Sequence, residues 1–132
     1  MIKLQPFGLN TTLHHIGLVV PSIQAVCPDC QIFEDPIQKV NVAFVFLHNQ
    51  YLELIEPNGE KSPVLLSLKK GTKLVHLCYE VENIEEALSL GGREGYHCLA
   101  KPVPAVAFDQ RRIAWVFHRS YGLIELLEKA TA

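Results

Sequence analysis

The two halves of the sequence share an internal repeat, and this repeat limits the possible folds more than any other feature. Three apolar segments of the first half recur in type and in the same order in the second: 15–20 as 76–81, 42–46 as 113–117, and 52–56 as 124–128. Such a repeat indicates one supersecondary unit used twice, with a core that the copies bury together. No linker or low-complexity tract separates the halves, so we expect a single domain over residues 1–132.

Each recurring segment is typical of a strand, because it is short, rich in Val, Ile, Leu and aromatic residues, and bounded by turn residues. The predicted strands cover 13–20, 31–34, 40–47, 51–56, 74–81, 97–101, 112–118 and 122–127. A hairpin is expected across His48-Asn49-Gln50, between the third and fourth of these strands.

A first helix is predicted over residues 62–69. Ser62 would be its N-cap, Pro63 would occupy the first helical position, and Gly71 would end it.

A second helix is predicted over residues 84–90. Asn83 and Glu86 would form its capping box, and Gly91-Gly92 would stop it. The matching place in the first half holds only a short helix at 23–27. Each half therefore has the order β-(α)-β-β-β, with module one at about 12–57 and module two at about 73–128.

Charge and composition exclude several classes of protein. The net charge is −2 and 48% of the residues are apolar. This weakly acidic balance argues against a basic nucleic-acid footprint or attraction to anionic membranes. No apolar run approaches the roughly 20 residues that span a bilayer, and the N-terminus lacks the regions of a signal peptide. We therefore expect a cytoplasmic α+β protein that binds neither nucleic acid nor membrane, with its four cysteines as reduced thiols.

Cys27 and Cys30 have the C-x-x-C spacing of redox and metal sites. One such pair provides too few ligands for a zinc site, and its surroundings lack a thioredoxin-like βαβ pattern. The sequence favours two free thiols in a short loop.

Two glutamates lie inside apolar strands at equivalent places of the repeat, Glu53 and Glu125. A carboxylate in such a place is costly unless it is paired or bound. His15 and His76 open the corresponding units, so the repeat predicts a set of two imidazoles and two carboxylates. This set suits Zn²⁺, Fe²⁺, Co²⁺, Ni²⁺ or Mn²⁺, and the absence of thiolate disfavours a closed structural zinc site. Four such ligands would leave positions open for Lewis-acid catalysis.

The motifs at 15–20, 53–57 and 74–81 resemble those of the vicinal oxygen chelate (glyoxalase/bleomycin-resistance/dioxygenase) superfamily. Residues 60–63 and 111–114 also fit its methylmalonyl-CoA epimerase-like branch. The resemblance implies two paired βαβββ modules that form an open, cupped, mostly antiparallel sheet around a divalent metal ion.

By the same resemblance, His15, Glu53, His76 and Glu125 would be the metal ligands, and Glu125 would also transfer the proton. The metal would bind two vicinal oxygens of a small substrate, acidify the carbon next to a carbonyl and hold the enediolate. The implied activity is that of an isomerase, epimerase-like or lyase-like enzyme, with an acyl-CoA or a similar molecule as substrate. Exposed strand edges give a physical reason to pair, so a homodimer is one expected assembly.

The sequence departs from that branch in two places. Ile37 stands where the branch has an acidic residue, so Glu34 or Asp35 would have to act as the second acid. The stretch 21–30 is shorter than the usual helix, which we expect to reshape one wall of the pocket. These departures favour an alternative function, a metal-free small-molecule binding protein of the bleomycin-resistance type.

An extradiol-type dioxygenase is a further alternative, because its iron site uses two histidines and one carboxylate. Glu53 as a fourth ligand would crowd that iron, so this function ranks lowest. The pairs Lys69-Lys70 and Arg111-Arg112 could attract phosphates, but ordinary solvated charges are the simpler interpretation.

Overall fold

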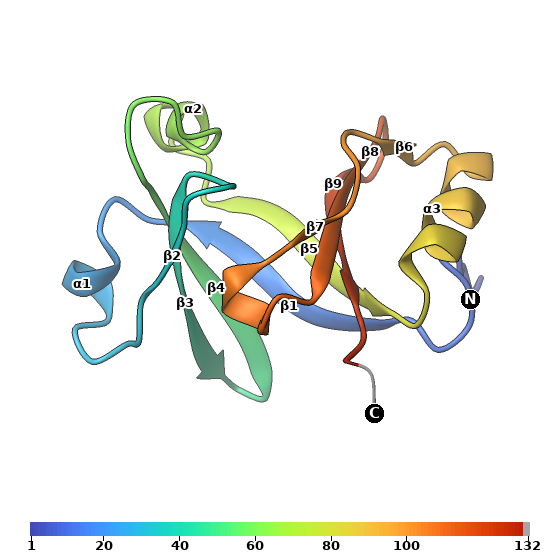
Figure 1. The fold of residues 1–132 in the computed structure, drawn as a ribbon, viewed down its shortest axis with the longest axis horizontal. Coiled ribbons are helices and arrows are strands. Elements are labelled where there is room, and N and C mark those ends of the chain that lie inside the picture. Colours follow the sequence, from blue (N-terminus) through green and yellow to red (C-terminus); the bar gives the residue numbers. More distant parts are fainter. Residues whose placement is uncertain (131–132) are drawn as a thin grey trace. The chain divides into compact units, whose positions relative to one another are not determined.

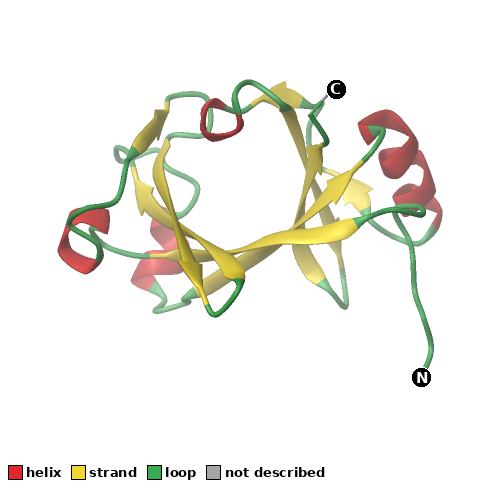
Figure 2. Ribbon diagram, turned by 90° about the horizontal axis from the view of Figure 1, so that it is seen from below, coloured by secondary structure: helices red, strands yellow, loops and turns green. Residues whose placement is uncertain are grey.

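The computed structural model describes residues 1–130 and has a mixed α+β architecture in which strands predominate (Figures 1 and 2). The predicted fold class is confirmed. The strands are β1 (Thr12–Val19), β2 (Phe33–Asp35), β3 (Val40–Leu47), β4 (Gln50–Pro57), β5 (Leu74–Val81), β6 (His97–Cys98), β7 (Val103–Pro104), β8 (Arg112–His118) and β9 (Gly122–Glu128). The helices are α1 (Ile23–Val26), α2 (Leu65–Lys69), α3 (Ile84–Arg93) and the 3-10 turn η1 (Val106–Phe108). No helix within residues 1–130 is long and apolar enough to cross a membrane.

The chain divides into two compact units. The first-half unit consists of His15–His76 and Val106–Asp109. Within the described residues, the second-half unit consists of Met1–His14, Leu77–Ala105 and residues 110–130.

Strands of the first-half unit follow the order β2-β3-β4-β1. β1 runs parallel to β4, whereas β3 is antiparallel to both β2 and β4. The predicted β3–β4 hairpin is confirmed, and its turn is the pair His48-Asn49, with φ of 47° and 65°. Positive φ at both central residues is what a two-residue type I′ turn requires. Gln50, expected in the turn, already belongs to β4.

The two faces of this sheet carry different clusters, because side chains alternate along each strand. On one face Val19, Val40, Val42 and Ile55 pack with α2 side chains such as Leu68. This is the face of His15 and Glu53, since these residues share the parity of Val19 and Ile55 in β1 and β4.

The opposite face carries Ile23 of α1 together with Ala43, Leu54, Cys27 and Cys30. The short helix therefore covers the face opposite to His15 and Glu53. The expectation that its shortening reshapes a wall of the pocket beside these two residues is wrong.

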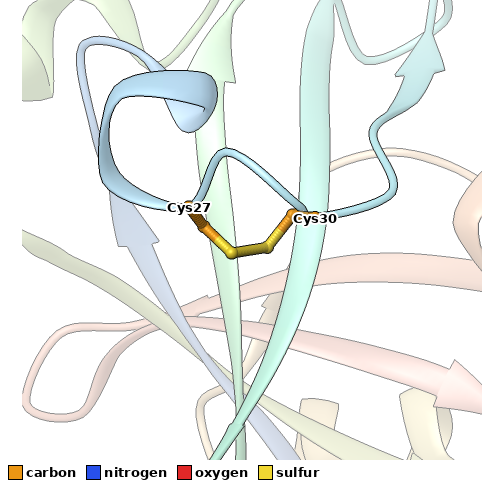
Figure 3. Close-up of a disulfide and its surroundings, with 2 residues drawn as sticks. All are labelled: Cys27 and Cys30. Atoms are coloured by element: carbon orange, nitrogen blue, oxygen red, sulfur yellow. A yellow bond between two sulfur atoms is a disulfide. The ribbon is translucent and has the colours of Figure 1, made fainter.

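Cys27 and Cys30 form a disulfide with a Cα–Cα distance of 5.5 Å (Figure 3). The prediction of reduced thiols is wrong for this pair. A backbone hydrogen bond from Cys30 N to Cys27 O closes the turn, and the resulting Cα separation falls within the range that a disulfide bridges. Cys78 and Cys98 form no disulfide within residues 1–130.

In the second-half unit the order is β5-β9-β8-β6, and β7 also pairs with β8. β5 and β9 are parallel, whereas β8 and β9 are antiparallel. The core packs α3 against the sheet, with Ile84, Val116 and Leu126 fully or almost fully buried. Phe7 and Tyr96 belong to the same cluster, with ring centroids 4.7 Å apart.

The start of α3 agrees with the prediction from the sequence, whereas its end does not. The Asn83 side chain accepts a hydrogen bond from Glu86 N at 2.9 Å, which confirms the cap. Gly91-Gly92 do not stop the helix, which continues to Arg93. Gly95, with φ of 89°, supplies the left-handed position beyond the last turn.

For α2, in contrast, the predicted end is correct and the predicted start is wrong. It begins at Leu65 rather than near Ser62, and its N-cap Val64 makes no side-chain hydrogen bond. Gly71 ends it as predicted, with φ of 74° and a bond from Thr72 N to Ser67 O.

β1, β4 and β9 differ from their predicted bounds by one residue at one or both ends, and two further strands differ more. The strand expected over 31–34 forms at Phe33–Asp35. Of the one expected over 97–101, only His97–Cys98 forms a strand, β6, and the short strand β7 lies beyond the predicted range.

Candidate metal centre

His15 and Glu53 lie on the same face of neighbouring parallel strands. Gly17 is the register partner of Glu53, which places Glu53 one step along that face from His15. His15 is 0% exposed and Glu53 is 6% exposed. The strand pairing thus buries an imidazole and a carboxylate side by side.

His76, near the start of β5, completes a cluster of three in the first-half unit. Its Nε2 lies 3.2 Å from Nε2 of His15. Oε1 of Glu53 lies 3.4 Å from each of these nitrogens. The three atoms form an almost equilateral triangle, and the side chains that hold them are buried.

The ring of His15 is also held by aromatic neighbours. Phe108 of η1 stacks on it, with an interplanar angle of 18° and centroids 5.7 Å apart. Phe44, opposite Glu53 in β3, meets the same ring edge-on at 5.5 Å. These rings fix the orientation of the imidazole and keep water away from it. Sequence reasoning missed both, because aromatic residues in apolar segments are ordinary core residues.

The triangle fits a divalent metal ion. Metal–ligand bonds of about 2.0–2.2 Å place neighbouring donor atoms roughly 3–3.5 Å apart around one ion. The spacing of His15, Glu53 and His76 falls in that range. Two imidazoles and one carboxylate are donors that suit zinc and the later first-row metals. Among residues 1–130 these three side chains belong to a group able to hold a metal ion.

Glu125 lies in the second-half unit, on β9, and is 3% exposed. Its register partners are Cys78 in β5 and Trp115 in β8. Cys78 follows His76 by two residues, as Gly17 follows His15, so Glu125 holds the position in its unit that Glu53 holds in the other. Its assignment as the fourth ligand and as the base stays a prediction of the repeat and the resemblance.

The register argues against Glu34 and Asp35 as a second acid. Asp35 is opposite Val40, four residues along β3 from the partner of Glu53, which is about 13 Å at the usual rise per residue. Its Oδ1 accepts hydrogen bonds from the backbone N–H groups of Ile37 and Gln38. Glu34 is exposed and points to the sheet face opposite to His15 and Glu53.

Arg111 and Arg112 are not the solvated charges that the sequence suggested. Arg111 Nη1 lies 2.8 Å from Glu80 Oε2. Arg112 donates to both carboxylate oxygens of Glu85, and this hydrogen bonding lowers the pKa of Glu85 and raises the pKa of Arg112. Both guanidinium groups therefore tie strands and helix together within the second-half unit.

Comparison with known proteins gives the family. Residues 14–115 match the glyoxalase/bleomycin resistance protein/dioxygenase superfamily. An ethylmalonyl-CoA/methylmalonyl-CoA epimerase of Cereibacter sphaeroides is 27% identical over 127 residues, covering 86% of this chain and 95% of that protein. The uncharacterized protein YqjC of Bacillus subtilis is 32% identical over 132 residues, covering 88% and 91%.

The fold has solved counterparts. The crystal structure of a hypothetical protein from Bacillus halodurans C-125 superposes with a TM-score of 0.76 at 28% identity, covering 93% of this chain and 97% of that one. With a profile match over most of its length, a relative at 32% identity and this fold, the chain belongs to the glyoxalase/bleomycin resistance protein/dioxygenase superfamily.

Proposed function

We propose that this protein is a divalent-metal-dependent epimerase that acts on the carbon next to the carbonyl of an acyl-CoA thioester, as methylmalonyl-CoA epimerases do. The observation that carries the proposal is the buried triangle of His15 Nε2, His76 Nε2 and Glu53 Oε1, with edges of 3.2–3.4 Å. The relative from Cereibacter sphaeroides, which aligns over 86% of this chain and 95% of its own length, supports the substrate class.

His15, Glu53 and His76 would hold the metal, with Glu125 as the fourth ligand. When bound, the ion would act as a Lewis acid on the substrate carbonyl and so increase the acidity of the neighbouring C–H bond. Phe44 and Phe108 pack against His15, and so they would keep one ligand ring fixed and dry.

Glu125 would remove the proton from the carbon. Its carboxylate is buried in an apolar strand between Ile124 and Leu126, and a positioned carboxylate is one of the groups that act as general bases in enzymes. Epimerisation also requires a proton to return on the opposite face. With Ile37 at the expected acidic position and Asp35 about 13 Å away along the strand, we propose that this proton comes from water.

The test combines metal binding with proton exchange. Apo protein titrated with Co²⁺ is expected to bind one equivalent, and His15→Ala is expected to lose it. Exchange of the substrate's α-hydrogen in D₂O, measured by NMR on methylmalonyl-CoA, is expected to drop by about a hundredfold or more in Glu125→Gln. Glu94→Gln, a substitution at an exposed glutamate of the second-half unit, serves as the matched control.

The outcomes separate the alternatives. Failure to bind Co²⁺, Zn²⁺ or Ni²⁺ at micromolar concentration would favour the alternative function, a metal-free small-molecule binding protein. Stoichiometric metal with undiminished exchange in Glu125→Gln would remove Glu125 from catalysis. Oxygen consumption with a catechol would instead point to the dioxygenase alternative.

Sedimentation of the purified protein would test the expected homodimer.

A further inference from the structure

We propose that Cys27 and Cys30 form a reversible thiol–disulfide exchange site that small-molecule thiols reduce and small-molecule disulfides reoxidise in the folded protein. The site is independent of the metal centre. It lies with α1 on the sheet face opposite to His15 and Glu53, so the proposed enzymatic function neither requires it nor predicts it.

The disulfide lies at the edge of the apolar cluster of Ile23, Ala43 and Leu54, against which both cysteines pack. Both cysteines are half-buried, and the residues between them, Pro28 and Asp29, are exposed. The flanking residues Val26 and Ile32 are also exposed, at 57% and 44%. We infer that a small thiolate reaches the bond from this exposed side, without disruption of the strands beneath it.

The segment does not depend on the disulfide for its position. Ser22 Oγ caps α1 by accepting a hydrogen bond from Ala25 N. Glu56 Oε1 accepts one from Ile23 N at 2.8 Å, and the Ile23 side chain is fully buried. These contacts anchor the beginning of the segment when the sulfurs are apart.

The backbone also keeps the cysteines close. Cys27 N donates to Ile23 O at 2.8 Å, and Cys30 N donates to Cys27 O at 3.2 Å. These two bonds hold the turn in which the Cα atoms lie 5.5 Å apart. A reduced pair would thus remain poised to form the bond again, because closing so short a loop costs little entropy.

Reduction of the protein disulfide consumes two glutathione molecules. A glutathione thiolate attacks one cysteine sulfur, the protein S–S bond breaks, and the other cysteine leaves as a thiolate that takes a proton from water. A second glutathione thiolate attacks the mixed disulfide and releases the first cysteine. Two glutathiones are oxidised to one glutathione disulfide, and the protein disulfide is reduced to two thiols.

The experiment follows this pair in the native protein. Cys98→Ser removes the exposed thiol, and buried Cys78 is an internal control. The variant is equilibrated in mixtures of reduced and oxidised glutathione, quenched in acid, alkylated and mapped by mass spectrometry. We expect the fraction of protein with both thiols reduced to follow the ratio of reduced to oxidised glutathione. Protein that starts reduced and protein that starts oxidised should give the same curve. Cys78 should form no mixed disulfide with glutathione.

Hydrogen exchange of the two states completes the test. Reduction is expected to accelerate amide exchange over residues 24–31 by about tenfold and to leave β3 and β4 unchanged. Cys27→Ser/Cys30→Ser should exchange like the reduced form. A bond that yields to glutathione only in denaturant, a dithiol that oxidised glutathione does not close, or reduction that unfolds the whole unit would each overturn the proposal.

Discussion

The imidazole of His76 lies directly over the backbone of Gly17. A Cβ atom at residue 17 would stand 2.3 Å from Cε1 of His76, 2.5 Å from Nδ1 and 2.9 Å from Nε2. Gly17 is also the register partner of Glu53. The missing side chain at position 17 is therefore what allows the His76 ring to bring its Nε2 to within 3.2 Å of His15.

Gly17→Ala is expected to weaken Co²⁺ binding by about 10–100-fold, the usual range for a change that misplaces a metal ligand. The added methyl must push the ring away, because real Cβ contacts under 3.0 Å essentially do not occur. Overpacking should also lower the stability of the apo protein by about 1–3 kcal/mol. Co²⁺ titration followed by absorption measures the first effect, and denaturation of the apo protein measures the second.

Two controls isolate the contact. Gly92→Ala adds the same methyl where nothing lies within 4 Å, so metal affinity should not change. In a His76→Ala background, Gly17→Ala should cost little stability because the obstructing ring is gone. Equal Co²⁺ affinity of Gly17→Ala and the parent protein would contradict the positioning role of Gly17.

The neighbouring glycines of α3 are expected to respond in opposite directions to alanine. A Cβ at Gly91 would lie 2.8 Å from Cε1 of Phe7, whereas one at Gly92 meets nothing. Gly91→Ala should destabilise the protein by about 1–3 kcal/mol. Gly92→Ala should stabilise it by up to about 1 kcal/mol, because alanine loses less backbone entropy in a helix.

Urea denaturation of both variants checks this pair. Equal effects of the two substitutions would show that helix propensity, and not the contact with Phe7, decides the stability at this position.

Glu56 should contribute to stability through its two hydrogen bonds. Its carboxylate accepts from Ile23 N and from Asn41 Nδ2, both at 2.8 Å. Glu56→Ala leaves both donors without this partner, which should cost about 1–3 kcal/mol. Denaturant unfolding measures the loss of stability. Hydrogen exchange should show faster exchange of the backbone amides of α1. Glu60→Ala, at an exposed position, should have almost no effect, and an equal loss there would contradict the assignment.

Strand positions were the part of the fold that could be predicted from the sequence. β3, β5 and β8 have the predicted bounds, since apolar and β-branched residues end at turn residues on both sides. The set His15, Glu53 and His76 was also predictable, because a buried carboxylate in a repeated strand needs partners.

The missed features depend on contacts that a sequence pattern does not carry. Gly17 and Gly91 are required by rings far away in the sequence, whereas the local pattern indicated a helix stop at Gly91. Cys27 and Cys30 were assigned as thiols from the expected compartment, although their pairing depends on the turn between them.

The ion pair of Arg112 and Glu85 predicts a specific acid limb of the stability curve. The hydrogen bond from Arg112 lowers the pKa of Glu85 from its ordinary value of 4.5. A carboxyl whose pKa is depressed in the folded state stabilises the fold above its unfolded pKa, and this stabilisation is lost as the pH falls through the folded pKa. Arg112→Gln should therefore lower the melting temperature at pH 7, and its difference from the parent protein should shrink from pH 5 downward.

Thermal unfolding at a series of pH values from 7 to 3 measures this difference. Because Glu85 is exposed, the effect at pH 7 should be small and should decrease in high salt. Arg119→Gln, at an exposed arginine of the β8–β9 turn, provides the control and should show no such trend. Arg112 also pairs with Glu128, so both carboxylates contribute to this trend. A difference between Arg112→Gln and the parent protein that stays constant down to pH 3 would mean that Arg112 stabilises the unit by packing of its side chain and not by its charge on Glu85 and Glu128.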